Sequence, residues 1–291
     1  MALEIRTILA NDRTLLDAVL SQDVDRIHTN EHVPPDAVRV ALLDGEPVAF
    51  AFAMLLPAER PWAMLRGFVK PEARRRGVGR ALLDHLTDYL HAQRHLPGLT
   101  EVAIGAWEPH DAVRALLEPL GYTHQRTYWR MRRPYAPVPA WGWPDGVQVR
   151  TIAAGAPVAD WNDAFNVSFA DHYRFVPSTV ADCEQLLQQG DVRPEDVLLA
   201  YESDRPVGFA RTARHGTLRE IETLGVIPAA RGRGLGRALL HWGIAELQRD
   251  ATDEVTLMVE GENANARRLY EASGFAIVRT RGLWARPLDF A

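Results

Sequence analysis

The stretch Val226-Ile-Pro-Ala-Ala-Arg-Gly-Arg-Gly-Leu-Gly-Arg-Ala-Leu-Leu240 reads as a strand that stops at a proline, a glycine-rich loop and the start of an amphipathic helix. Glycines let the backbone of such a loop approach a ligand closely, because no Cβ intervenes. The N–H groups of the loop converge at a helix N-terminus, which favours a phosphate, and arginines add charge-assisted contacts. The stretch therefore predicts a cradle for a pyrophosphate group. It contains neither the lysine of a P-loop nor the glycine spacing of a dinucleotide fingerprint.

The same stretch occurs earlier as Val69-Lys-Pro-Glu-Ala-Arg-Arg-Arg-Gly-Val-Gly-Arg-Ala-Leu-Leu83, in step and without a gap. Three further pairs of segments recur in the same order: 5–8 with 149–152, 47–50 with 206–209, and 116–122 with 269–275. Matched blocks in one order, separated by loops of different length, indicate two copies of one fold. The proline-rich segment 135–145 predicts a linker, so we expect one domain at 1–134 and a second at 146–291.

Each half is expected to be mixed α/β. In the second half, the patterns predict strands at 196–200, 205–212 and 219–227, a helix at 236–249, a strand at 254–259, a helix at 264–272 and a final strand at 276–284. The length of 291 residues fits two domains of ordinary size.

Composition excludes several classes of protein. A net charge of −5 and a pI near 6.1 argue against a nucleic-acid binder. The longest apolar stretch, Val48 to Ala58, is too short to cross a membrane, and charged residues near the N-terminus argue against a secretion signal. The single cysteine, Cys183, excludes an intramolecular disulfide and a thiolate-based zinc cluster. We therefore expect a cytoplasmic protein without a bound metal or a membrane partner.

The two motifs of the second half resemble a known family. Val226-x-Pro228-x-x-Arg231-Gly-x-Gly234-Leu-Gly236 is similar to the acetyl-CoA signature of the GNAT superfamily of N-acetyltransferases, and Asn263-x-x-Ala-x-x-Leu-Tyr270-x-x-x-Gly-Phe275 resembles the family's second motif. The resemblance covers both halves. It implies tandem domains, each a twisted, mixed and mostly antiparallel sheet flanked by helices, whose fourth and fifth strands splay apart around the pantetheine arm of acetyl-CoA, the co-substrate.

The resemblance also implies which residues bind the cofactor. Backbone groups of Leu224, Gly225 and Val226 would meet the pantetheine and the thioester. The pyrophosphate would lie on the loop of Arg231, Gly232, Arg233, Gly234, Leu235, Gly236 and Arg237. Asn263 would hydrogen-bond to the CoA, or it would serve as the N-cap of its helix. The matching residues of the first half are Phe68, Val69, Arg74, Arg75, Arg76, Gly77 and Gly79.

Acetyl transfer to an amine needs a base for the amine and an acid for the leaving thiolate. Glu220 and Glu222 stand two apart on the predicted strand and therefore on one face, which suits a base or an amine site; a solvated pair of acids is the alternative. Tyr270 matches the tyrosine that donates the proton in the family, and a tyrosine packed on the sheet is the alternative.

The first half departs from this pattern. Leu117 stands where Tyr270 does, His110 where Asn263 does, and the matched strand carries Ala63 and Leu65 in place of the two glutamates. Because a leucine cannot donate a proton, we expect the first half to be degenerate. It would bind acetyl-CoA weakly or serve to bury surface.

The aromatic segment 161–175, which contains His172, has no counterpart in the first half and matches the place that lines the acceptor site in the family; an aromatic core is the alternative. The sequence predicts an N-acetyltransferase that acts on the primary amine of a small molecule, as a monomer or homodimer. Two alternatives stay open: an enzyme like mycothiol synthase, which is also tandem and whose acceptor is a cysteinyl pseudodisaccharide, and an acyl-CoA-binding scaffold without catalysis.

Overall fold

The computed structural model describes residues 2–9, 33–56, 62–93, 99–109, 111–190, 192–249 and 254–288. The chain divides into two compact units. The first unit comprises Met1–Arg126 together with Arg281–Ala291, and the second comprises Thr127–Thr280. The predicted mixed α/β fold, present twice, is confirmed in both units.

The first unit is a six-stranded sheet with a long helix on one face. The strands follow one another across the sheet as β1 (Leu3–Thr7), β2 (Val38–Leu43), β3 (Glu46–Leu56), β4 (Trp62–Val69), β5 (Glu101–Trp107) and β12 (Ala276–Pro287). All neighbours are antiparallel except β4 and β5. Helix α2 (Val78–Ala92) packs on β2, β3 and β4, and α3 (Asp111–Leu117) follows β5. Short 3-10 turns lie at Pro35–Ala37, Pro71–Ala73 and Glu118–Leu120.

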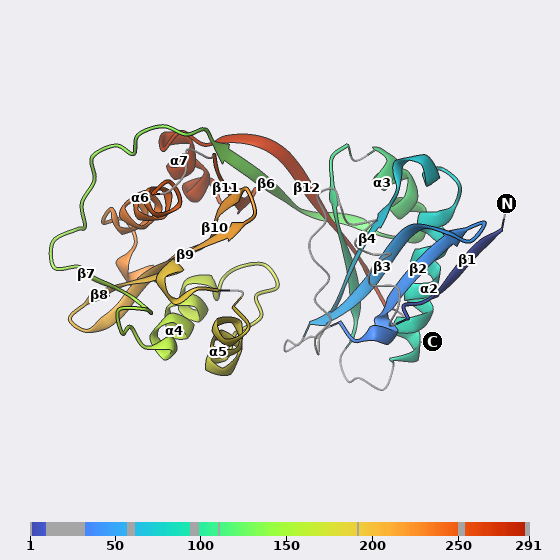
Figure 1. The fold of residues 1–291 in the computed structure, drawn as a ribbon, viewed down its shortest axis with the longest axis horizontal. Coiled ribbons are helices and arrows are strands. Elements are labelled where there is room, and N and C mark those ends of the chain that lie inside the picture. Colours follow the sequence, from blue (N-terminus) through green and yellow to red (C-terminus); the bar gives the residue numbers. More distant parts are fainter. Residues whose placement is uncertain are drawn as a thin grey trace. The chain divides into compact units, whose positions relative to one another are not determined.

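The second unit repeats this plan. Its strands lie in the order β7 (Gln148–Thr151), β8 (Val197–Glu202), β9 (Arg205–His215), β10 (Leu218–Val226), β11 (Val255–Glu260) and β6 (Thr123–Arg133). Helices α4 (Val158–Phe169) and α5 (Val180–Gln188), which are described before β8 in the chain, cover one face, and α6 (Leu235–Leu247) and α7 (Ala264–Ala272) cover the other (Figure 1). Short 3-10 turns lie at Pro194–Asp196 and Pro228–Ala230.

Local sequence signals explain why these elements form where they do. The β8–β9 hairpin turns at Ser203 and Asp204, which both have positive φ (48° and 61°), and the matching hairpin of the first unit turns at Asp44 and Gly45 (51° and 88°). Two central residues with positive φ give the turn whose twist suits a hairpin. On α6 the buried side chains recur at helical spacing, and full burial of a leucine contributes about 1.5–3 kcal/mol.

The last strand of each copy completes the sheet of the other. Residues 281–287 of β12 pair with residues 101–107 of β5, and residues 128–133 of β6 pair with residues 255–260 of β11. The compact units therefore differ from the predicted division at 1–134 and 146–291, because 127–133 belongs to the second unit and 281–291 to the first. Repeats in a sequence show which segments match, but they do not show which copy of a strand pairs with which neighbour.

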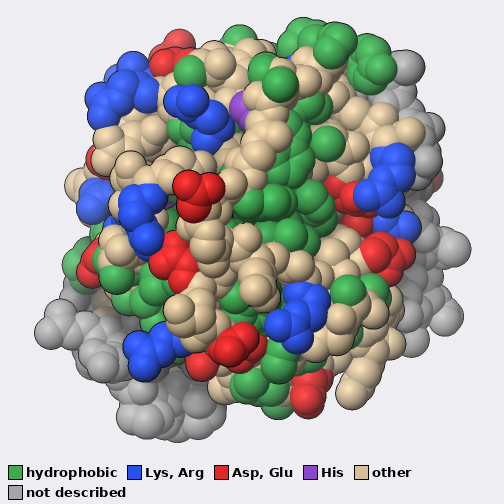
Figure 2. Space-filling view, turned by 90° about the vertical axis from the view of Figure 1, so that its left-hand side faces the viewer, with side chains coloured by type: hydrophobic (Ala, Val, Ile, Leu, Met, Phe, Trp, Pro, Cys, Tyr) green, Lys and Arg blue, Asp and Glu red, His purple; other side chains and the backbone are tan. Residues whose placement is uncertain are grey.

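The predicted linker 135–145 contains no helix or strand and packs on the second unit. The guanidinium of Arg133, which is buried, donates to the carbonyls of Ala136 and Pro137. The Trp141 ring lies near His241 of α6. Figure 2 views the molecule from the left-hand side of Figure 1, where the second unit carries β7 and β8, and shows apolar side chains across the middle of this face between charged ones. No helix in the described part of the chain is long and apolar enough to span a membrane.

Candidate active site

The predicted cradle of the second unit is an open loop at the start of α6. Gly232 and Gly234 have φ of +79° and +87°, and α6 begins at Leu235 with no side chain capping its first N–H groups. A Cβ added at either glycine would meet nothing within 4 Å. Glycine is therefore favoured at both positions by the positive φ, and not by a lack of space for a side chain. The uncapped N–H groups of a helix start fit the phosphate groups of acetyl-CoA.

The first unit has the same cradle. Arg75 and Gly77 have φ of +61° and +81°, and α2 begins after Gly77, again without a side-chain cap. A Cβ added at Gly79 or at its counterpart Gly236 would lie 3.5 Å or 3.7 Å from the nearest leucine carbon, which is an ordinary van der Waals distance. The backbone conformation of the predicted cradle is therefore the same in both units.

The arginines of the cradles have protein partners. The Nε of Arg231 donates to the carbonyl oxygen of Val226 (3.0 Å), and the Nε of Arg74 donates in the same way to Val69 (3.0 Å). Arg233 forms an ion pair with Glu202 (3.0 Å) at the turn of the β8–β9 hairpin. The side chains of Arg75 and Arg237 are exposed in the two loops, whereas Leu235 is buried in the core.

Strands β10 and β11 separate beside the cradle, as the resemblance implied. They pair only from Arg219 to Ile221 on the side of β10, although β10 continues to Val226 and β11 to Glu260. The register between β9 and β10 also shifts between Ile221 and Thr223, so that Glu222 is the extra residue of a bulge. The segment Leu224–Val226 therefore borders a gap between two strands, where its backbone can meet a ligand.

Glu222 lies on the face of the sheet that α4 covers. Its carboxylate is 2.6 Å from the guanidinium of Arg211, which lies over the ring of Trp161 of α4 at 6.0 Å from the centroid. Glu220 pairs with Ala213 in the register, one step from the bulge. The α4 helix also supplies Phe165 and Phe169, whose rings pack on Phe209 of β9. The aromatic segment thus contributes to the core as well as facing the acids.

In β4 of the first unit, the bulge is absent, because its register with β3 is continuous. In the first unit Ala63 pairs with Val102, and in the second unit Arg219 pairs with Val255. These two pairs occupy the same position in the two sheets. Glu220 therefore matches Met64 and not Ala63, and Glu222 has no counterpart in β4. Our gapless match was wrong at this point, since the bulge inserts one residue. No carboxylate stands in β4 with either match.

Tyr270 and Asn263 lie on α7, the helix after β11. Tyr270 is buried beside Phe275, and desolvation by burial raises the pKa of its phenol to about 12. The phenol is therefore protonated at neutral pH, as a proton donor must be. The Oδ1 of Asn263 accepts a hydrogen bond from the N–H of Ala266 (3.0 Å), so Asn263 is the N-cap of the helix. In the first unit, Leu117 is fully buried in place of Tyr270, and His110 lies outside the described residues.

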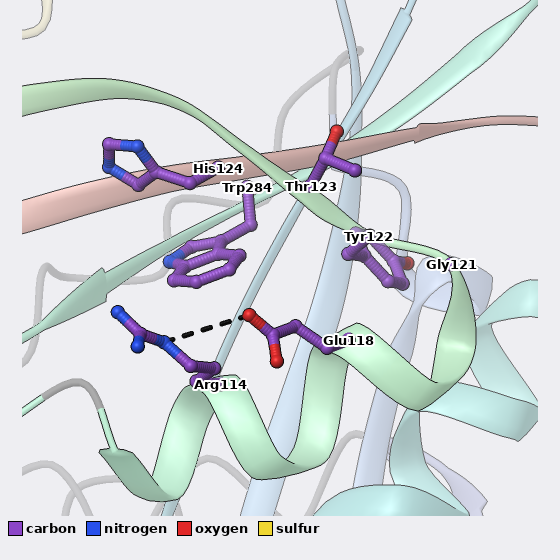
Figure 3. Close-up of a pocket in the computed structure, with 7 residues that line it drawn as sticks. All are labelled: Arg114, Glu118, Gly121, Tyr122, Thr123, His124 and Trp284. Atoms are coloured by element: carbon purple, nitrogen blue, oxygen red, sulfur yellow. Dashed lines mark ion pairs between the residues drawn. The ribbon is translucent and has the colours of Figure 1, made fainter.

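A cavity of about 500 Å³ lies in the first unit. Figure 3 shows the ion pair between Arg114 of α3 and Glu118 of the 3-10 turn that follows it, below the ring of Trp284 from β12. Its lining residues are Arg114, Glu118, Gly121, Tyr122, Thr123, His124 and Trp284. None of them is a predicted site residue. Among the described residues, no three side chains of the metal-binding types gather into a cluster.

Sequence reasoning missed Arg211, Ser168 and Glu202. Each reaches the predicted site from another strand or helix, and none belongs to a motif. Arg211 contacts Glu222, Glu202 contacts Arg233, and the carbonyl of Ser168 accepts from Arg231 (3.1 Å). Such partners are separated widely in sequence, so spacing alone gives no signal for them.

Comparison with known proteins agrees with this geometry. The model of the acetyltransferase (GNAT) family matches residues 4–122 and again residues 158–275. A mycothiol acetyltransferase of Thermobispora bispora is 35% identical over 256 residues, which cover 83% of this chain and 81% of the relative. A mycothiol acetyltransferase of Geodermatophilus obscurus is 34% identical, covering 75% and 72%.

Solved structures share the fold over the whole chain. A GCN5-related N-acetyltransferase from Sphaerobacter thermophilus has a TM-score of 0.78 at 25% identity and covers 99% of this chain and 96% of that one. A tandem GNAT protein from the clavulanic acid biosynthesis pathway has a TM-score of 0.73 at 17% identity, with 99% of both chains covered. The chain therefore belongs to the acetyltransferase (GNAT) family, in which acetyl-CoA is the co-substrate, and it is an acetyl-transferring enzyme with two copies of the family's domain.

Proposed function

We propose that the chain transfers an acetyl group from acetyl-CoA to the primary amine of a small molecule, and that the second unit alone performs the reaction. The observation that carries this proposal is the bulge at Glu222. The second unit combines this bulge and two acids with a gap between β10 and β11 and an open cradle, whereas the first unit has a cradle and a β4 that pairs with β5 over only part of its length, but neither the bulge nor the acids.

The residues have distinct roles in this proposal. When bound, acetyl-CoA supplies the activated acetyl group. The N–H groups at the start of α6 hold its phosphates, and the backbone of Leu224–Val226 orients the thioester in the gap. Glu222 or Glu220 accepts the proton of the amine, directly or through water, and the ion pair with Arg211 holds the carboxylate of Glu222 in place. Tyr270 protonates the leaving thiolate.

The first unit keeps the cradle without the proton-transfer groups. We propose that it binds acetyl-CoA weakly or acts as a scaffold, since Phe68 stands where the second unit has Gly225. A cytoplasmic location remains a prediction that rests on the composition and the single cysteine.

The relatives suggest the first acceptor to test. One mycothiol acetyltransferase matches 83% of the chain, and this similarity favours a cysteinyl pseudodisaccharide as the acceptor. Glu220 and Glu222 suit the ammonium group of such a molecule, because carboxylates attract cations.

The experiment incubates the full chain with acetyl-CoA and a panel of primary amines that includes the cysteinyl pseudodisaccharide, and mass spectrometry detects the acetylated product. Detection of the released thiol would be confounded by an acceptor that carries its own thiol. Gly77→Val and Gly234→Val are assayed as a matched pair. We expect turnover to be lost in Gly234→Val and kept in Gly77→Val; equal loss in two folded variants would contradict the division of labour.

A further inference from the structure

Arg231 joins three parts of the second unit. Its Nε donates to the carbonyl of Val226 at the end of β10, and its Nη2 donates to the carbonyl of Ser168 in the last turn of α4 (3.0 and 3.1 Å). The last carbonyls of a helix have no partner within the helix and carry partial negative charge, so a guanidinium is a suitable donor there. One side chain thus connects the cradle, the strand end and the helix on the acceptor side.

The end of α4 also lies directly on the strand segment that borders the gap. An added Cβ at Gly225 would be 2.7 Å from the Cβ of Ser168 and 2.6 Å from Cε1 of Phe209, so only glycine allows this approach. Any movement of α4 is therefore transmitted to the backbone of Gly225. The bond from Arg231 to Ser168 holds the helix at this contact.

The first unit provides an internal comparison. Arg74 repeats the bond from Nε to the strand-end carbonyl, at the same 3.0 Å. Its guanidinium lies over the ring of Phe68, 5.9 Å from the centroid, and Phe68 is the residue that matches Gly225. The bond from an arginine to the strand end therefore occurs in both cradles. Within the described residues, the close contact between a glycine of this strand and the end of a helix is seen at Gly225 of the second unit.

We propose that Arg231 is a positioning residue that couples the cofactor cradle to the acceptor side of the site, and that it is not a ligand of the pyrophosphate. Two backbone carbonyls direct its guanidinium toward the strand end and α4. The uncapped N–H groups at the start of α6 remain to hold the phosphates. This inference rests on the function proposed above.

The test compares two acetyl donors, acetyl-CoA and S-acetylpantetheine, which share the thioester and the pantetheine arm while only the first carries phosphates. If Arg231 positions the site, Arg231→Lys lowers kcat/KM by the same factor with both donors, about 10- to 100-fold, the usual range for misplacement of reacting groups. If it binds phosphate, the loss appears with acetyl-CoA alone, and the proposal is overturned. Arg233→Ala, in the same loop but without a bond to β10 or α4, is the matched control and should affect acetyl-CoA alone.

A second measurement does not depend on turnover. Amide hydrogen exchange in residues 158–169 should become faster in Arg231→Lys and stay unchanged in Arg233→Ala, with circular dichroism showing that both variants are folded. Unchanged exchange in Arg231→Lys would overturn the inference even if the variant loses activity. A wild-type chain that acetylates no amine with either donor would instead refute the proposed function, and the exchange experiment would still decide the role of Arg231.

Discussion

The carboxylate of Glu222 and the guanidinium of Arg211 lie 2.6 Å apart, at the bulge of β10 in the second unit. The pair is partly exposed, so it contributes little to stability. Its consequence is positional, because the guanidinium holds the carboxylate of Glu222 at the strand that borders the gap. A carboxylate fixed there can accept the proton of an incoming ammonium group.

Removing this cation should lower the efficiency of the reaction. In Arg211→Met, the carboxylate of Glu222 loses the partner that holds it at the bulge, so kcat/KM should fall about 10- to 100-fold, the usual range for misplacement of reacting groups. Steady-state rates measured beside the wild type check this loss. Glu222→Gln should lower kcat about 10²-fold, the usual contribution of a general base. If Glu220→Gln shows the larger loss and Glu222→Gln keeps full activity, Glu220 is the base.

Replacement of Tyr270 tests the proton donor. Tyr270→Phe keeps the ring in the core and removes the hydroxyl, so kcat should fall about 10²-fold while acetyl-CoA affinity, measured by calorimetry, stays the same. Because the pKa of Tyr270 is about 12, its ionisation should produce no alkaline limb below pH 10 in the wild type. Unchanged turnover of the phenylalanine variant would remove Tyr270 from the mechanism.

A buried ion cluster in the second unit makes a separate prediction about stability. Asp196 is buried and bonded to Arg193 (2.6 Å) and to Arg214, and these arginines lower its pKa from the usual 3.8 although desolvation by burial opposes the shift. A carboxyl whose pKa is lower in the folded state stabilises the fold above its unfolded pKa, and this contribution is lost as the pH falls through the folded pKa.

The variant Asp196→Asn should therefore lose about 3 kcal/mol at pH 7, because Arg193 and Arg214 lose the buried carboxylate between them and keep Glu195 and Glu246 as partners. It should also lose less stability than the wild type between pH 5 and pH 3. Urea unfolding at several pH values measures both effects. Parallel pH profiles for the two proteins would show that Asp196 does not carry this dependence.

Local signals in the sequence were sufficient to predict the helices and strands of the second unit, but they were not sufficient to predict which strands pair with one another. Helix α7 spans the predicted 264–272, since Asn263 caps its start and Gly274, with φ of +90°, follows its end. The strands before it lie within a few residues of the predicted ones. These features depend on neighbouring residues, which a single sequence displays directly.

The bulge, the partners of the arginines and the exchange of strands depend on contacts between distant segments. Glu222 matches Leu65 in a gapless alignment, and only the cross-strand register reveals the inserted residue. The hydrogen bonds from Arg231 to two backbone carbonyls cannot be read from the sequence, because every residue has a backbone carbonyl. The sequence therefore predicted which loop forms the cradle, but it could not predict what its side chains contact.

The exchanged strands predict where the chain can be divided. A cut at the linker leaves residues 1–134 without the strand 281–287 and residues 146–291 without the strand 128–133, so each fragment has an unpaired edge on β5 or β11. Such an edge promotes aggregation, and the first fragment also loses the buried Trp284 from its core. We expect fragment 146–291 to be insoluble or unfolded, and fragment 127–280, which contains a complete sheet, to fold and to bind acetyl-CoA. Circular dichroism, size-exclusion chromatography and calorimetry of both fragments check this. If 146–291 folds and binds as well as 127–280 does, pairing of β6 with β11 is dispensable for the second unit.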